Sequence, residues 1–305
     1  MDLSGESRKI EFGNLELLAR KAVEGFIIGL HKSPFHGFSV EFAEHRLYNQ
    51  GESTKNVDWK VFARSEKLFV KRFEEETNLR CQIIIDTSSS MYFPRNDKNR
   101  NKFEFSALAA AALMNLLKKQ RDAFGLSLFN EDIEVHHKCK SSTVHYNLLI
   151  SILEKKLQEK DQVRKSFVVD ALHKIADSIH RRSLVIIFSD MLENDEHADE
   201  LFSALQHLKY NKHKVILFHT LDYSKELDFE YTDRPYRFID METGEKLTLH
   251  PKEIKEIYTE RMHGFLNELK LRCMQYNIDF VPADIQEGVQ HVLQTYLVKR
   301  KKMNI

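Results

Sequence analysis

Oxygen-bearing side chains crowd into one short stretch of the sequence. Asp86, Ser88 and Ser90 alternate as D-x-S-x-S directly after three consecutive isoleucines, Ile83–Ile85. One carboxylate and two hydroxyls offer oxygen ligands without neutralising a divalent cation, which suits Mg²⁺ or Mn²⁺. The spacing therefore predicts a metal site on a surface turn. A Ser-rich loop with a capping Asp is the alternative interpretation of the same residues.

A second oxygen-rich turn, Ser189-Asp190, follows the apolar run Leu184–Phe188. Short apolar runs of this kind are typical of strands buried on both faces of a parallel sheet. Ligands of open α/β sheets bind at the carboxyl ends of the strands. The two turns are therefore expected to meet at one edge of the sheet, which adds Asp190 to the candidate metal ligands.

The elements that must position these residues alternate along the chain. Strand-like runs occur at residues 83–85, 123–129, 184–188, 214–220 and 279–281. Segments with helical periodicity occur at residues 15–28, 103–119, 144–157, 167–179, 198–208, 252–276 and 287–302. This order predicts a Rossmann-like α/β fold with a mostly parallel sheet and helices on both faces.

Two regions depart from the alternation. Residues 1–78 are predicted to be an N-terminal elaboration packed on the main α/β domain, residues 79–305. Near residues 227–250, the alternating stretches Phe229–Tyr231, Arg237–Asp240 and Lys246–Leu249 surround a turn. These stretches predict a small antiparallel insertion.

Composition restricts the possible classes of protein. The chain has 305 residues, with 46 basic and 46 acidic side chains, so no general nucleic-acid binding is expected. The basic run Lys299–Lys302 suits the end of a helix. Three scattered cysteines form no disulfide framework, and no apolar run is long enough to span a membrane. A cytoplasmic protein is expected.

Known catalytic patterns are absent from the sequence. It contains no G-x-G-x-x-G, Walker A or G-x-S-x-G motif. His136 and His137 are adjacent, and adjacent residues on a strand point to opposite faces, which disfavours a shared zinc ion. We therefore expect a protein that is not an enzyme. Metal-dependent hydrolysis is the alternative, because a bound cation can activate water.

The D-x-S-x-S stretch followed later by Ser189-Asp190 resembles the metal-ion-dependent adhesion site (MIDAS) of von Willebrand factor A-type domains. The resemblance implies a third hydroxyl ligand from an intervening loop. In the matching stretch, residues 166–172, Ser166 stands where the family usually has Thr. Thr143 is the alternative for this position. A site of this kind leaves a coordination position open for an acidic side chain of a protein partner.

The resemblance extends upstream of the isoleucine run. Residues 29–190 resemble the bacterial domain-of-unknown-function family fifty-eight (DUF58), with Gly51-Glu52-Ser53 in place of the usual G-D-D. The residues that match the family pattern are Glu41–Arg46, Tyr48, Gly51, Val57–Lys60, Ala63–Arg64 and Glu74–Asn78. Members are often encoded beside MoxR-type AAA+ ATPases. The resemblance therefore implies an adaptor or assembly factor that binds such an ATPase.

Overall fold

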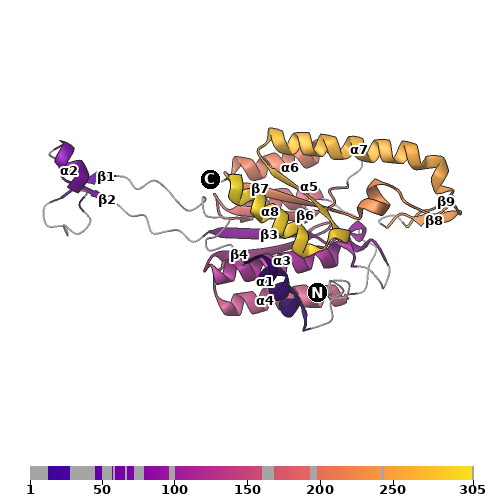
Figure 1. Cartoon of the computed structure of the whole chain (residues 1–305), viewed down its shortest axis with the longest axis horizontal. Coiled ribbons are helices and arrows are strands. Elements are labelled where there is room, and N and C mark those ends of the chain that lie inside the picture. Colours follow the sequence, from indigo (N-terminus) through magenta and orange to yellow (C-terminus); the bar gives the residue numbers. More distant parts are fainter. Residues whose placement is uncertain are drawn as a thin grey trace. The chain divides into compact units, whose positions relative to one another are not determined.

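The structure of the chain is a computed structural model (Figure 1). It describes residues 13–27, 45–49, 57, 59–65, 67–71, 79–95, 100–159, 168–192, 198–241 and 244–303. The chain divides into two compact units, one comprising Met1–Pro34 and Arg80–Ile305 and the other Phe35–Leu79. Helix α1 (Leu15–Ile27), which lies within the elaboration predicted over residues 1–78, packs on helix α3 (Lys102–Lys119) of the larger unit.

The larger unit is built on a six-stranded sheet of order β10-β7-β6-β3-β4-β5. Every pairing is parallel except that of β4 with β5, which is antiparallel. The predicted mostly parallel α/β sheet is therefore confirmed, with β5 as an edge strand that the prediction lacked. The strands are β3 (Arg80–Asp86), β4 (Ala123–Phe129), β5 (Ile133–Lys140), β6 (Leu184–Ser189), β7 (Lys214–Leu221) and β10 (Asp279–Asp284).

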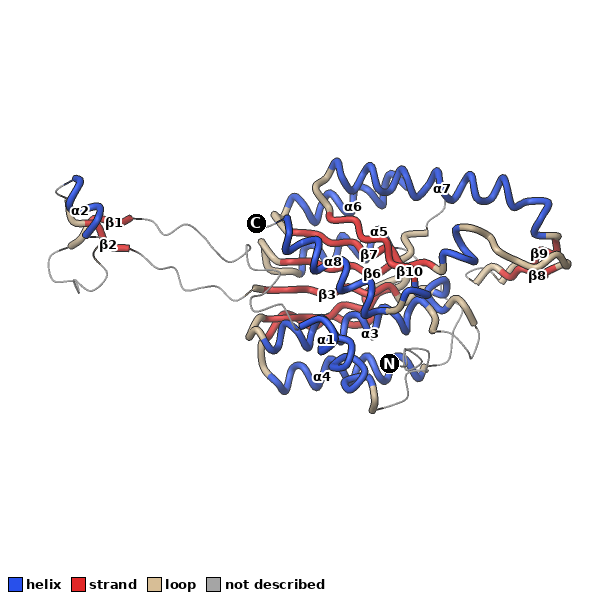
Figure 2. The backbone as a smooth tube through the Cα atoms, viewed as in Figure 1, coloured by secondary structure: helices blue, strands red, loops and turns tan. Residues whose placement is uncertain are grey.

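Helices cover both faces of this sheet, as predicted (Figure 2). On one face, Ile84, Ile187 and Leu217 share a buried cluster with α5 (Val168–Ser178), α6 (Ala198–Tyr210) and the end of α7 (Pro251–Gln275). The other face carries α3 (Lys102–Lys119), against which α1, α4 (Thr143–Gln158) and α8 (Val289–Met303) pack. Central strands lie between two apolar layers, so their side chains are buried on both faces.

Helix α3 places a charged residue, Lys102, deep inside this layer. Its Ala- and Leu-rich sequence is buried along most of its length. The helix begins with a capping box, in which Asn101 Oδ1 accepts from the Glu104 amide and Glu104 Oε2 accepts from the Asn101 amide. The cap fixes the first turn, and Lys102 is the first residue of that turn.

The antiparallel insertion is confirmed in its hairpin, β8 (Tyr236–Ile239) paired with β9 (Lys246–Leu249). The predicted strand at Phe229–Tyr231 is wrong. Phe229 has a φ of +50°, and its ring lies 4.4 Å from that of Tyr258 and 5.6 Å from that of Phe238. The aromatic spacing at this point reflects ring packing against helix α7 rather than a strand.

The smaller unit contains the antiparallel pair β1 (His45–Leu47) and β2 (Phe69–Lys71), with helix α2 (Trp59–Ser65) between them in the sequence. Within it, the Trp59 ring packs edge-on against Phe62 at 6.1 Å. In the part of the chain that the structure describes, no helix is long and apolar enough to cross a membrane.

Gly125 of β4 allows a close approach between three strands. A Cβ at this position would lie 2.3 Å from Gln82 Oε1 and 2.5 Å from the His137 carbonyl oxygen. Gly125→Ala is therefore expected to lower the free energy of unfolding by about 1–3 kcal/mol, as overpacking does. Gly264→Ala is the matched control, because its Cβ would meet nothing within 4 Å on helix α7. It should stabilise by about 0.5–1 kcal/mol. Thermal or urea unfolding measures both; equal effects would contradict the packing argument.

Candidate metal and partner site

The two oxygen-rich turns lie side by side at the carboxyl edge of the sheet. Strand β3 pairs in parallel with β6, and Ile85 lies opposite Phe188. The register therefore places Asp86 beside Ser189, whose hydroxyl donates to Asp86 Oδ2 at 2.7 Å. Asp190 follows immediately. The structure thus brings together the two turns that the sequence places about a hundred positions apart.

The D-x-S-x-S turn folds back on its own carboxylate. The Ser88 amide donates to Asp86 Oδ1 at 2.8 Å, and the Ser88 and Ser90 hydroxyl oxygens lie 3.1 Å apart. Ser90 also hydrogen-bonds the Asp190 side chain. Four of the five predicted ligands, Asp86, Ser88, Ser90 and Asp190, therefore form one cluster.

The sequence predicted that the D-x-S-x-S turn lies on the surface. This prediction is wrong, because most of the turn is buried. Asp86 and Asp190 are each 1% exposed and Ser88 is fully buried, while Ser90 is partly exposed.

The second turn has a strained residue. Met191, which follows Asp190, has a φ of +50°, a conformation that costs free energy for any residue other than glycine. Its amide donates to the Ser189 hydroxyl at 2.9 Å, which holds the second turn closed.

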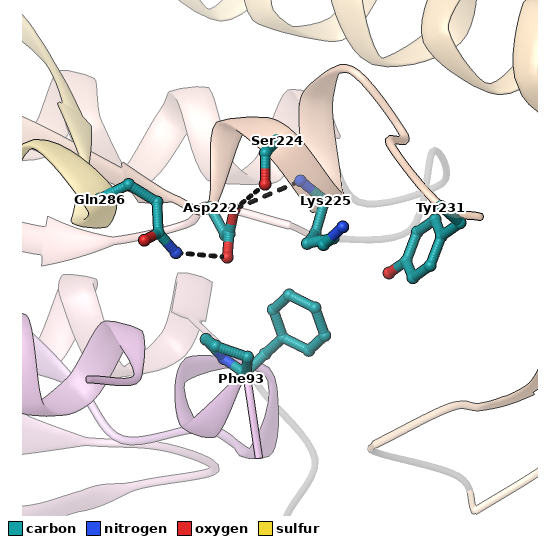
Figure 3. Close-up of a pocket in the computed structure, with 7 residues that line it drawn as sticks. Phe93, Asp222, Ser224, Lys225, Tyr231 and Gln286 are labelled. Atoms are coloured by element: carbon teal, nitrogen blue, oxygen red, sulfur yellow. Dashed lines mark hydrogen bonds between the residues drawn. The ribbon is translucent and has the colours of Figure 1, made fainter. Parts of the chain in front are cut away.

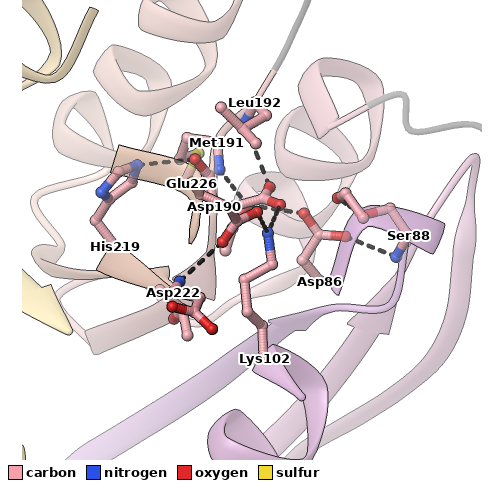
Figure 4. Close-up of polar contacts among 12 residues, drawn as sticks. Asp86, Ser88, Lys102, Asp190, Met191, Leu192, His219, Asp222 and Glu226 are labelled. Carbon is pink, nitrogen blue, oxygen red and sulfur yellow. Dashed lines mark hydrogen bonds and ion pairs between the residues drawn. The ribbon is translucent and has the colours of Figure 1, made fainter. Parts of the chain in front are cut away.

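Two residues outside the motifs complete the cluster (Figure 4). The Lys102 ammonium lies 2.8 Å from Asp190 Oδ2 and 2.5 Å from Glu226 Oε1, and its side chain is fully buried. Glu226 belongs to the π-helical turn η5 (Tyr223–Leu227), which follows β7. The Glu226 Oε2 atom accepts from the Asp222 amide at 2.8 Å. π-Helical turns are frequent at functional sites.

The sequence contained one signal for Lys102 and none for Glu226. The capping box at Asn101 and Glu104 predicts a helix start, where the positive end of the helix dipole disfavours a cation. A lysine in that first turn needs acidic neighbours from elsewhere in the fold. Glu226 lies in an irregular turn and carries no periodicity that could assign it to the site.

Burial and charge shift the acidity of this cluster. Burial, reinforced by the neighbouring Asp190 carboxylate, raises the pKa of Asp86 to about 7. Burial also acts to raise the pKa of Asp190, but Lys102 outweighs it and lowers that pKa below its usual value. Burial raises the pKa of Glu226, although the ammonium opposes the shift. The cluster is therefore short of positive charge at Asp86.

His219 of β7 fixes the main chain of the second turn. Its Nε2 donates to the Asp190 carbonyl oxygen at 2.8 Å, and its side chain is fully buried. Burial lowers the pKa of His219 to about 4, so the ring is neutral near pH 7. His219 positions Asp190 without adding charge to the cluster.

The predicted third hydroxyl has two candidates, Ser166 and Thr143. Ser166 lies outside the described residues. Thr143 begins α4 after β5, whose Lys140 lies opposite Phe124 at the start of β4. Phe124 lies five residues before Phe129, the residue of β4 that is opposite Asp86. At 3.3 Å per strand residue, the two ends of β4 are therefore roughly 17 Å apart. The alternative assignment of Thr143 is therefore wrong, because the antiparallel strand β5 returns the chain to the opposite edge.

The hydroxyl pair fits a small divalent cation. Adjacent ligands of an octahedral Mg²⁺ ion lie roughly 2.9 Å apart for bonds of about 2.1 Å, close to the 3.1 Å between Ser88 Oγ and Ser90 Oγ. Within the described ranges, no group of three or more His, Cys, Asp or Glu side chains could hold a metal ion. Any ion here would depend on serine hydroxyls as well as carboxylates. The same cluster would hold it through Ser88 and Ser90, with Asp86 and Asp190 behind them.

A pocket of about 370 Å³ opens near this edge (Figure 3). One wall carries Asp222, whose carboxylate accepts from Gln286 Nε2 at 2.9 Å and from the Ser224 hydroxyl at 3.0 Å. Phe93 and Tyr231 contribute aromatic surface. Asp222 also donates its amide to Glu226, so the pocket shares a residue with the turn that holds Lys102.

The fold and the cluster define a class: an α/β protein with an acid–hydroxyl site at the carboxyl edge of its sheet. Residues 44–263 match the family described as Protein of unknown function DUF58, and the chain belongs to that family. The family prediction made from the sequence is therefore confirmed.

Comparisons with individual proteins add relatives. The chain is 25% identical over 178 residues to the uncharacterized protein Rv1480 of Mycobacterium tuberculosis and to an uncharacterized protein of Mycobacterium bovis. The match covers 58% of this chain and spans about half of each relative, 55% of its length.

Two solved structures are similar in part. The hypothetical protein BatB from Bacteroides thetaiotaomicron gives a TM-score of 0.41 at 13% identity. An aerotolerance-related membrane protein from Bacteroides fragilis gives 0.45 at 14%. Each comparison covers 74% of this chain and 100% of the other. TM-scores of this size do not establish a shared function.

The raised pKa of Asp86 makes stability depend on pH. In the unfolded chain Asp86 loses its proton near pH 4, but in the folded chain it keeps the proton until about pH 7. Folding is therefore penalised increasingly as the pH rises through this window. Asp86→Asn removes the titration, so without metal the variant should gain about 4 kcal/mol over the wild type from about pH 4 to about pH 8.

Melting temperatures of the wild type and of Asp86→Asn, measured in chelator across this pH range, test the expectation. His219 titrates in both proteins, so its contribution cancels in the difference. A difference that stays constant with pH would show that folding does not raise the pKa of Asp86.

Proposed function

We propose that the chain is a protein-binding module whose acid–hydroxyl cluster takes a divalent cation, Mg²⁺ or Mn²⁺, that receives an acidic side chain of a partner. The observation that carries the proposal is the convergence of Asp86, Ser88, Ser90 and Asp190 at one edge of the sheet. Ser88 and Ser90 would hold the ion directly, and hydroxyl ligands leave it enough charge to attract a carboxylate. The same residues carry the resemblance of the sequence to a MIDAS.

The excess negative charge of the cluster supports the same proposal. Burial, reinforced by the Asp190 carboxylate, raises the pKa of Asp86 to about 7, and a bound divalent cation would favour its charged form. Ser90 is the partly exposed member of the motif. A partner would therefore approach from its side, and Ser166 remains the proposed third hydroxyl.

For the partner we propose a MoxR-type AAA+ ATPase in the cytoplasm, on the strength of family membership. The chain would act as an adaptor or assembly factor, and the ion would act as a removable clamp between the two proteins. We propose that no turnover accompanies binding. Both site carboxylates accept hydrogen bonds from their own chain, Asp86 from Ser88 and Ser189 and Asp190 from Leu192 and Lys102. These hydrogen bonds hold both carboxylates in place, which supports a binding role for them rather than proton transfer.

Ser90→Ala tests the clamp. It removes one ligand oxygen from the partly exposed end of the motif. A MoxR-type ATPase from the same organism should bind the variant about tenfold or more weakly in Mg²⁺, the cost of one hydrogen bond to a charged group. Binding of the wild type should be lost in chelator. Pull-down and titration calorimetry with and without Mg²⁺ provide the measurement.

Ser178→Ala is the matched control, since this partly buried serine donates to the Ile175 carbonyl at the C-terminus of α5, away from the cluster. It should leave binding unchanged. Chelator-resistant binding of the wild type, or equal effects of the two substitutions, would overturn the ionic clamp.

The absence of turnover is tested separately. The wild-type protein, incubated with Mg²⁺ or Mn²⁺ and general phosphatase, nuclease and ATPase substrates, should release no product above the level of a Ser90→Ala control. Metal-dependent hydrolysis that disappears in Ser90→Ala would establish the alternative, a metallohydrolase that uses the same cluster.

A further inference from the structure

Lys102 occupies an unfavourable place for a cation. It is the first residue of α3, where the helix dipole is positive, and its side chain is fully buried. Two carboxylates nevertheless lie within ion-pair distance of its Nζ, Asp190 Oδ2 at 2.8 Å and Glu226 Oε1 at 2.5 Å. The ammonium is therefore held in its charged form by these two carboxylates.

The ammonium and a divalent cation would use the same carboxylate. Asp190 Oδ2 accepts from Lys102 at 2.8 Å, and Asp190 Oδ1 accepts from the Leu192 amide at 3.3 Å. Ser90, one of the two hydroxyl ligands, also bonds to Asp190. A cation held by Ser88 and Ser90 would thus face Asp190 while Lys102 is already bound to it.

Resting on the metal-dependent function proposed above, we propose that Lys102 is a tethered cation that competes with the divalent ion for Asp190. In the metal-free protein the ammonium bridges Asp190 and Glu226. Metal binding displaces it from Asp190 and leaves it on Glu226. Lys102 therefore sets the metal affinity of the site.

Glu226 is built to retain the displaced ammonium. Its Oε1 faces Lys102, its Oε2 accepts from the Asp222 amide at 2.8 Å, and its main-chain carbonyl accepts from the Tyr258 hydroxyl at 2.9 Å. Turn η5 and helix α7 thus hold the carboxylate in place. Because Glu226 keeps the ammonium paired, Asp190 can be released without leaving a buried charge uncompensated.

The decisive variant is the double substitution Lys102→Met with Glu226→Gln. It removes one positive and one negative charge, so the net charge of the cluster equals that of the wild type, and no buried ammonium is left unpaired. Free Mn²⁺ is measured by electron paramagnetic resonance during titration of the full chain. Without its competitor, the double variant should bind Mn²⁺ about tenfold more tightly than the wild type. Adding Asp86→Ala to either protein should abolish this binding and so locate it.

Glu226→Gln alone provides a second test that retains the lysine. Lys102 then has only Asp190 as a partner, so Mn²⁺ should bind several-fold more weakly than to the wild type. Lys118→Met is the control for loss of one lysine, because Lys118 lies over the Tyr146 ring near the other end of α3. It should leave Mn²⁺ affinity unchanged.

Each outcome decides between the two proposals. Tighter binding by the double variant and weaker binding by Glu226→Gln support the competition. Equal affinity of the wild type and the double variant would overturn it, while metal binding itself would stand. Binding by the double variant alone would support Lys102 as the competitor and overturn a metal-dependent function of the wild type. Absence of Mn²⁺ binding by both proteins would overturn both.

Discussion

The buried ammonium of Lys102 between Asp190 and Glu226 is the contact on which the site depends. It joins the first turn of α3, the end of β6 and turn η5, three segments far apart in the sequence. Burying three charged groups is costly, and their mutual attraction offsets this only when the geometry is good. Burying these groups therefore costs stability, while their ion pairs hold this edge of the sheet in one arrangement.

The remaining polar groups of the edge follow from that arrangement. Ser189 and the Ser88 amide satisfy Asp86, Ser90 and Leu192 bond to Asp190, and neutral His219 holds the main chain beneath. Buried carboxylates without such donors would be protonated or would destabilise the fold. Asp86 lies near this limit, since its pKa is raised to about 7. The same shortage of positive charge makes the cluster receptive to a cation.

Glu226 also connects the cluster to the insertion. Its carbonyl accepts the Tyr258 hydroxyl of α7, and the Tyr258 ring lies 4.4 Å from that of Phe229. Phe229 in turn stacks on Phe238 of the β8–β9 hairpin at 5.6 Å. A continuous path of hydrogen bonds and ring contacts therefore runs from Lys102 to the hairpin. Nothing in the order of these residues along the chain indicated that they touch.

The sequence by itself determined the sheet strands that carry the motifs, most of the helices, the family and four clustered candidate ligands, Asp86, Ser88, Ser90 and Asp190. Apolar runs and helical periodicity are local patterns, and parallel strand ends meet at one edge by geometry. Only the tertiary structure decided that Lys102 and Glu226 join the site, that the Asp86 turn is buried, and that Thr143 lies at the opposite edge. Burial and long-range ion pairs depend on which distant segments pack together, and the direction of an edge strand such as β5 depends on its pairing. Burial, long-range ion pairs and strand direction produce no periodic pattern in the sequence of the residues concerned.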